Sequence, residues 1–120
     1  MNNLYDQDNI FAKILRSEVP CNKILENEHA LAFSDINPQA PIHTLVIPKN
    51  SYINFYDFTK NASNKEHEIF WKLVRDVIEH YKLEQEGFRI ITNSGNNGNQ
   101  DVPHFHVHLL GGENLGRMIG

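Results

Sequence analysis

Apolar residues in the second half of the chain follow a helical spacing. These residues, which form one apolar stripe, are Phe70, Leu73, Val74, Val77, Ile78 and Tyr81. This repeat places every apolar side chain on one face of a helix. Ser63 and Glu66 stand at the spacing of a capping box, and Gly87 follows the end of the stripe. We therefore predict one long amphipathic helix that begins after Ser63.

Shorter patterns fill the rest of the chain. An apolar stripe over residues 10–15 predicts a short helix, capped by Asp8 or Asn9 and ending before Pro20. Strands are expected over residues 23–26, 30–34, 42–47, 88–92 and 102–110. Residues 35–41 and 93–99 read as a turn and a loop, and residues 52–56 are ambiguous. Most connections are too short for parallel crossovers, so we predict an α+β fold with an antiparallel sheet.

Composition narrows the class of protein. The chain has 120 residues, which suits a single domain, and 11 Lys and Arg against 15 Asp and Glu give a net charge of −4. Nucleic-acid binding through the phosphate backbone needs clustered positive charge, so we expect no such partner. The polar N-terminus and the absence of an apolar run of ~20 residues predict a cytoplasmic protein without a membrane partner. Cys21 is the single cysteine, which excludes an internal disulfide.

Three of the seven histidines alternate with apolar residues in the segment His104-Phe-His-Val-His-Leu-Leu110. Successive side chains of a strand point to opposite faces. We therefore expect His104, His106 and His108 on one face, and the apolar residues between them packed against the long helix. The isolated histidines, His29, His67 and His80, are expected on solvated surface.

Three interpretations of the histidine row are open. The first, a solvated strand face, is more often built from threonine or charged residues. The second is a metal site, with His43, Asp35 or Asp101 as further ligands, but the row spans about 13 Å and cannot easily share one ion. The third is catalysis on a phosphate, with one imidazole as nucleophile and its neighbours as proton or hydrogen-bond donors. The Gly- and Asn-rich loop upstream adds amide donors for an anion. We favour the third interpretation and expect no metal and no cofactor.

The sequence resembles a known protein family, and the similarity extends well beyond the histidines. Four blocks carry it: Asn9-Ile-Phe-Ala-Lys-Ile-Leu15, Leu31-Ala-Phe-Ser-Asp-Ile-Asn-Pro-Gln-Ala-Pro-Ile-His43, Leu45-Val-Ile-Pro-Lys49 and His108-Leu-Leu-Gly-Gly112. Together with the alternating histidines, they resemble the nucleotide-binding (Hint) branch of the histidine triad (HIT) family. The resemblance implies a single HIT domain over residues 1–120, with an N-terminal arm (1–8) and a C-terminal tail (113–120). It also implies a five-stranded antiparallel sheet, one long and one short helix, and a homodimer whose sheets join.

The resemblance also implies roles for individual residues. His106 matches the nucleophile that forms a covalent nucleotidyl-histidine, His108 the residue that assists the leaving group, and His104 and His43 the residues that support the row. Asp35 matches a ribose-binding carboxylate. The purine pocket is matched by Ile10, Phe11, Ile14, Val19, Phe33 and Ile36, for which ordinary core packing is the alternative. The phosphate side is matched by Asn93, Gln100, Asp101 and Val102.

The implied activity is that of a purine nucleoside phosphoramidate hydrolase that releases AMP or GMP. A dinucleoside polyphosphate hydrolase and a nucleotide-binding regulatory module with incidental hydrolysis remain alternatives. The chain departs from its relatives in three places. Asn9 and Ala12 replace a zinc-binding cysteine pair of some members, and the tail lacks the tryptophan of animal members. Asp101 stands where a small hydroxyl residue is common, and its charge would repel a phosphate dianion.

Overall fold

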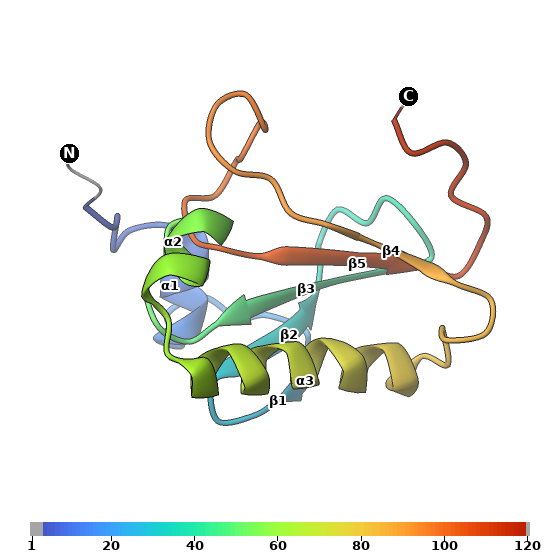
Figure 1. Cartoon of the computed structure of the whole chain (residues 1–120), viewed down its shortest axis with the longest axis horizontal. Coiled ribbons are helices and arrows are strands. Elements are labelled where there is room, and N and C mark those ends of the chain that lie inside the picture. The colour runs from blue at the N-terminus through green and yellow to red at the C-terminus, as the bar shows by residue number, and fades with distance from the viewer. Residues whose placement is uncertain (1–3, 120) are drawn as a thin grey trace.

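The structure is a computed structural model that describes residues 4–119. Residues 1–3 of the predicted arm and residue 120 of the predicted tail lie outside the described residues. The elements, in chain order, are α1 (Ile10–Leu15), β1 (Lys23–Glu26), β2 (Ala30–Ser34), β3 (Ile42–Pro48), α2 (Phe55–Asn61), α3 (Asn64–His80), β4 (Phe88–Ile91) and β5 (Val107–Gly111). The strands form one sheet in the order β1-β2-β3-β5-β4, and every neighbouring pair is antiparallel (Figure 1). The predicted α+β class and the five-stranded antiparallel sheet are confirmed.

The sheet lies between helices on its two faces. The long helix α3 runs along one face, where its apolar stripe packs on Ala30 and Ala32 of β2 and on Val107 and Leu109 of β5 (Figure 1). The helix α1 covers part of the other face, where Phe11 packs against the alternate residues of β2 and β3. Because β2 and β3 are covered on both faces, their sequences are almost continuously apolar.

Local signals predicted the two helices with strong caps. The Ser63 side chain accepts a hydrogen bond from the Glu66 N–H, and the Glu66 carboxylate accepts one from the Ser63 N–H, so the capping box is present. Asn9 caps α1 by accepting from the Ala12 N–H. The fold has one more short helix, α2, than predicted. Among its residues only Phe58 is buried, so it has no apolar repeat for the sequence to reveal.

The last strand is shorter than the predicted span of 102–110. β5 begins at Val107, so His104 and His106 precede it. Pro103 has no N–H to donate to a neighbouring strand, and the Phe105 N–H donates instead to the Tyr52 carbonyl at 2.7 Å. The alternation of faces nevertheless persists through this segment, since Phe105 and Val107 both lie in the core beneath the histidines.

Pairing of β3 with β5 sets the position of the site. Leu45 lies opposite His108, and His43 lies opposite Leu110. His43 and His108 are therefore diagonal neighbours on the same face of the sheet, within reach of each other.

The helices described within residues 4–119 include none with the length and apolar character of a membrane span.

Candidate active site

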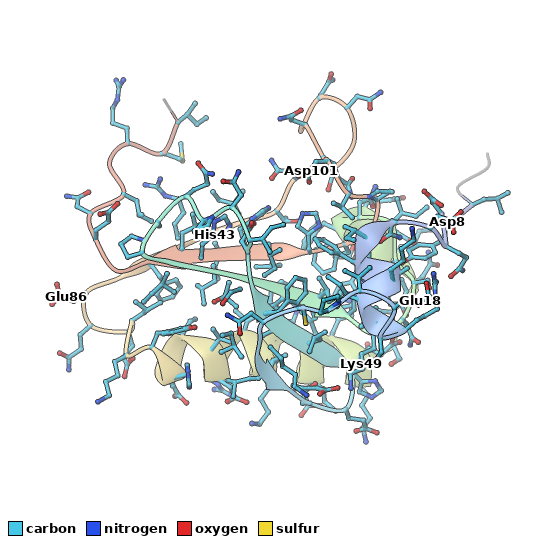
Figure 2. All side chains as sticks on the ribbon, turned by 180° about the vertical axis from the view of Figure 1, so that it is seen from behind. Asp8, Glu18, His43, Lys49, Glu86 and Asp101 are labelled. Atoms are coloured by element: carbon cyan, nitrogen blue, oxygen red, sulfur yellow. The ribbon has the colours of Figure 1, made fainter. Side chains whose placement is uncertain are left out.

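A cavity of about 480 Å³ opens on the face of the sheet that α1 covers. Its polar lining includes Asp35 at the end of β2, His43 on β3, His108 on β5 and Asp101 on the loop before β5. Figure 2 shows this face, with α1 in front of the sheet and Asp101 on the loop above it. The volume is in the range of small-molecule sites. A larger hollow of about 720 Å³ lies between the end of α3 and the tail, but the described residues that line it include no histidine. Because His43 and His108 line the smaller cavity, that cavity is the candidate active site.

The apolar wall of the cavity contains all six residues predicted for the purine pocket. They are Ile10, Phe11, Ile14, Val19, Phe33 and Ile36. Their burial differs: Phe11 and Phe33 belong to the core cluster under α1, whereas Ile36 is 97% exposed. An isoleucine this exposed at the rim of the cavity would gain burial from an apolar group bound there. Pro20 and Cys21 also line this wall and were not among the predicted pocket residues.

A chain of hydrogen bonds fixes which nitrogens of His43 and His108 carry protons. The backbone N–H of Gln39 donates to His43 Nδ1 at 3.0 Å, so this nitrogen is an acceptor. The proton of the neutral His43 ring is therefore on Nε2, which lies 2.9 Å from His108 Nδ1 and donates to it. The neutral His108 ring then keeps its proton on Nε2. The Asp35 carboxylate lies 3.4 Å from His43 Nε2 and supports the same arrangement.

His106 has the opposite arrangement. Its Nδ1 lies 2.7 Å from the carbonyl oxygen of His104, and because a carbonyl can only accept, Nδ1 is the donor. In the neutral ring the Nε2 lone pair is therefore free, and it lies 3.8 Å from Asp101 Oδ1. The ring is 2% exposed and lies behind the cavity lining, 5.0 Å from the ring of His108 and 4.9 Å from that of Phe11. The two histidines thus offer a lone pair and an N–H side by side.

His104 is a buried support. Its Nε2 donates to the carbonyl of Pro48 at 2.9 Å, and its Nδ1 accepts from the hydroxyl of Tyr5, whose ring packs edge-on against the imidazole. Both ring nitrogens are used within the protein. The contribution of His104 to the site is its carbonyl, which holds His106. Tyr5 was not among the predicted residues, because a contact across 99 positions leaves no local signal.

Burial keeps the supporting imidazoles neutral. It lowers the pKa of His104 to about 4 and that of His108 to about 4, and neighbouring His106 acts in the same direction on both. Burial also lowers the pKa of His43, against the opposing effect of the Asp35 carboxylate.

The expectation that His29 and His67 lie on solvated surface was wrong. Both are half-buried, and the His67 ring packs against Phe58, whereas His80 is exposed.

Two of the residues predicted to contact the phosphate, Asn93 and Gln100, make hydrogen bonds to backbone carbonyls instead. The Asn93 side chain donates to the Gly98 carbonyl, and that of Gln100 donates to the carbonyls of Ile53 and Val102. These amides hold the loop in place and do not line the cavity. Of the four residues predicted for this side, Asp101 and Val102 do line it.

One group of side chains has the composition of a metal site. Ligand atoms of Asp35, His43 and His108 lie within 4.8 Å of one another. The facing nitrogens of the two histidines are already joined by a hydrogen bond, so a metal would have to displace that proton. His104 and His106 are not part of this group. That the chain uses neither metal nor cofactor stays a prediction.

Known proteins resemble this chain over most of its length. Residues 16–115 match the HIT domain family. A HIT-like protein of Azospirillum brasilense is 50% identical over 115 residues, which cover 96% of this chain and 94% of that protein. The purine nucleoside phosphoramidase of Escherichia coli is 37% identical, with 94% of both chains covered. A solved HIT family hydrolase from Clostridium thermocellum has a TM-score of 0.81 and 36% identity, with 95% of this chain and 98% of that chain covered. The chain therefore belongs to the HIT domain family.

Proposed function

We propose that this protein is a purine nucleoside phosphoramidate hydrolase that transfers a nucleotidyl group to His106 and then to water, releasing AMP or GMP. The observation that carries the proposal is the pairing of opposite tautomers. His106 Nε2 has a free lone pair, and His108 Nε2 has a proton. The name of the Escherichia coli relative, which is similar over nearly its whole length, supports the same reaction class.

In this proposal the apolar wall of the cavity binds the base of the ligand, and the polar residues bind its ribose and phosphate. A purine base fits between the exposed Ile36 and the aliphatic side chains of α1, because a flat apolar ring buries both. Asp35 lines the cavity, and its Oδ1 accepts from the Asn37 N–H at 2.8 Å, which fixes the carboxylate as an acceptor for ribose hydroxyls. The phosphorus then lies between His106 and His108.

The proposed reaction has two displacement steps. In the first, the His106 Nε2 lone pair bonds to the α-phosphorus, the phosphorus–nitrogen bond breaks, and the departing amine takes a proton from solvent while the His108 Nε2–H donates a hydrogen bond to the reacting group. In the second, water attacks the phosphorus, the phosphorus–Nε2 bond breaks, and the proton lost by the water returns to solvent. His104 and His43 act as positioning residues, because each holds the tautomer of its neighbour.

A substrate panel tests the proposal. Turnover of adenosine and guanosine phosphoramidates is compared with turnover of diadenosine polyphosphates, for the native protein, His106→Asn and the control His80→Asn on the exposed end of α3. We expect rapid cleavage of the phosphoramidates, loss of turnover in His106→Asn with AMP binding retained, and native rates in His80→Asn. Faster cleavage of diadenosine polyphosphates would overturn the substrate class, and native turnover by His106→Asn would exclude His106 as the nucleophile.

A further inference from the structure

The candidate cavity is unusual in its charge. Its described lining residues include two carboxylates, Asp35 and Asp101, and neither lysine nor arginine. Proteins that hold phosphate dianions commonly use arginine or lysine for this purpose. The two imidazoles of the lining, His43 and His108, are neutral because burial disfavours their charged forms. The cavity therefore offers hydrogen-bond donors to a phosphoryl group but surrounds it with negative charge.

Asp101 is the carboxylate placed to act on a phosphoryl group. Its Oδ1 lies 3.8 Å from His106 Nε2, so a phosphorus approaching or bonded to that nitrogen comes close to this negative charge. The side chain is 82% exposed and stands on the loop above the sheet (Figure 2). Asp35, by contrast, is mostly buried and is engaged with the Asn37 N–H and with His43.

Phosphoryl compounds of the proposed reaction differ in charge. A phosphomonoester such as AMP is largely a dianion above about pH 6. A phosphoramidate with one amine and one nucleoside substituent has a single ionisable oxygen and is a monoanion. Dinucleoside polyphosphates place additional charged phosphates next to the reacting one. Repulsion by a carboxylate increases with each charge, and water and salt reduce it at an exposed position.

We infer that Asp101 is a specificity-determining residue that makes the site favour monoanionic nucleoside phosphoramidates over dianionic nucleoside monophosphates and polyanionic dinucleotides. The inference rests on the proposed function and specifies its substrate class. It also gives the site a means to release its product, because hydrolysis turns a monoanion into a dianion beside Asp101.

Calorimetric titration with three ligands of increasing charge tests the inference: adenosine, adenosine 5′-methylphosphate and AMP. In Asp101→Asn we expect AMP to bind about three- to tenfold more tightly than in the native protein, since a unit charge is removed near an exposed phosphate. The gain should be smaller for the methylphosphate and absent for adenosine. It should also shrink in roughly 1 M salt. Glu86→Gln is the matched control, because it removes an exposed carboxylate at the end of the molecule opposite α1 (Figure 2).

The outcomes separate this inference from the proposed function. If the native protein binds AMP and Asp101→Asn binds it with unchanged affinity, Asp101 does not select charge. The same follows if the substitution shifts the affinity for all three ligands equally, or if Glu86→Gln gives the same gain. If the native protein binds none of the adenosine ligands, the proposed function fails, and the inference fails with it.

Discussion

The ring of His104 shows how single hydrogen bonds set the chemistry of the site. Each nitrogen has one partner, the Pro48 carbonyl on one side and the Tyr5 hydroxyl on the other. The ring itself is completely buried. A buried nitrogen without a partner is costly, so Tyr5 stabilises both the fold and the orientation of the carbonyl that holds His106.

Replacing Tyr5 with phenylalanine tests this contact. The variant keeps the ring but leaves His104 Nδ1 without its donor, and we expect the free energy of unfolding to fall by about 1–3 kcal/mol. Denaturant unfolding measures the change. Tyr56→Phe on α2, where the side chain is 68% exposed, is the control and should stay within about 0.5 kcal/mol of the native protein. Equal stability of native protein and Tyr5→Phe would show that the hydroxyl contributes nothing.

Burial of His104 also predicts how stability depends on pH. Its pKa is about 4 in the folded protein, below the ordinary histidine value of 6.5, so the unfolded chain binds the proton more readily. The stabilisation is complete above pH 6.5 and is lost as the pH falls toward 4. For His104 alone the expected loss is about 2 kcal/mol between pH 7 and pH 5.

Denaturant unfolding at pH 7, 6 and 5 checks this expectation. The ion-paired carboxylate of Glu26 does not contribute to the change in this range. Its pKa is lowered to about 2, so its stabilisation is lost only at more acidic pH. His80→Asn, at an exposed position, should show the same pH dependence as the native protein. A free energy of unfolding that stays constant from pH 7 to pH 5 would mean that His104 is not buried in its neutral form.

At the scale of elements, the start of α3 is connected to the histidine segment. Glu66 completes the capping box with Ser63 and also accepts a hydrogen bond from the Tyr52 hydroxyl at 2.8 Å. The Tyr52 carbonyl in turn accepts from the Phe105 N–H, between the first two histidines of the row. The cap of a helix far along the sequence therefore helps to hold the segment that carries His104 and His106.

Two substitutions separate the cap from this longer connection. Ser63→Ala removes the cap alone, and we expect it to cost about 1 kcal/mol in the free energy of unfolding. Glu66→Ala removes the cap and the acceptor of Tyr52, so it should cost more, about 2–3 kcal/mol. Denaturant unfolding of both variants gives the comparison. If Ser63→Ala is as damaging as Glu66→Ala, the bond to Tyr52 has no energetic weight.

Elements with local signals were predictable from the sequence, and those that depend on distant partners were not. The strands β1 and β2 were predicted at their observed bounds, and α3 was recognisable from its stripe and cap. The helix α2 has a single buried residue, and β5 starts late because the Phe105 N–H bonds to Tyr52. Likewise, the alternating pattern identified the histidine row, but the tautomers depend on carbonyls and on Tyr5, whose positions only the fold defines.

At the scale of the whole molecule, the two edges of the sheet differ. The edge strand β1 carries Lys23 and Glu26, which form an ion pair at 2.9 Å and protect that edge with charge. The other edge strand, β4, exposes Phe88, Ile90 and Ile91 by 36–43% each. The one charged side chain of β4, Arg89, donates to the Gly116 carbonyl, and the remaining apolar edge is suited to pairing with another strand. We propose that the predicted homodimer forms by pairing β4 with β4 of a second copy.

Sedimentation velocity with an edge variant tests the dimer. Ile90→Lys places a charge on β4 of both copies, and we expect it to convert a dimeric native protein into monomers. Lys23→Ala on β1 is the control and should remain dimeric. A native protein that sediments as a monomer would exclude the dimer, and a dimeric Ile90→Lys variant would place the interface elsewhere.

The proposed function depends on attack of the His106 Nε2 lone pair on phosphorus. Its most direct test is to quench the protein during turnover of an adenosine phosphoramidate, to measure the intact mass, and to locate any modification by peptide mass spectrometry. We expect one adenylyl group per chain on His106, absent from His106→Asn and still present in His80→Asn. Adenylylation of a different residue, or release of AMP by the native protein with no adenylylated form under any quench condition, would contradict it.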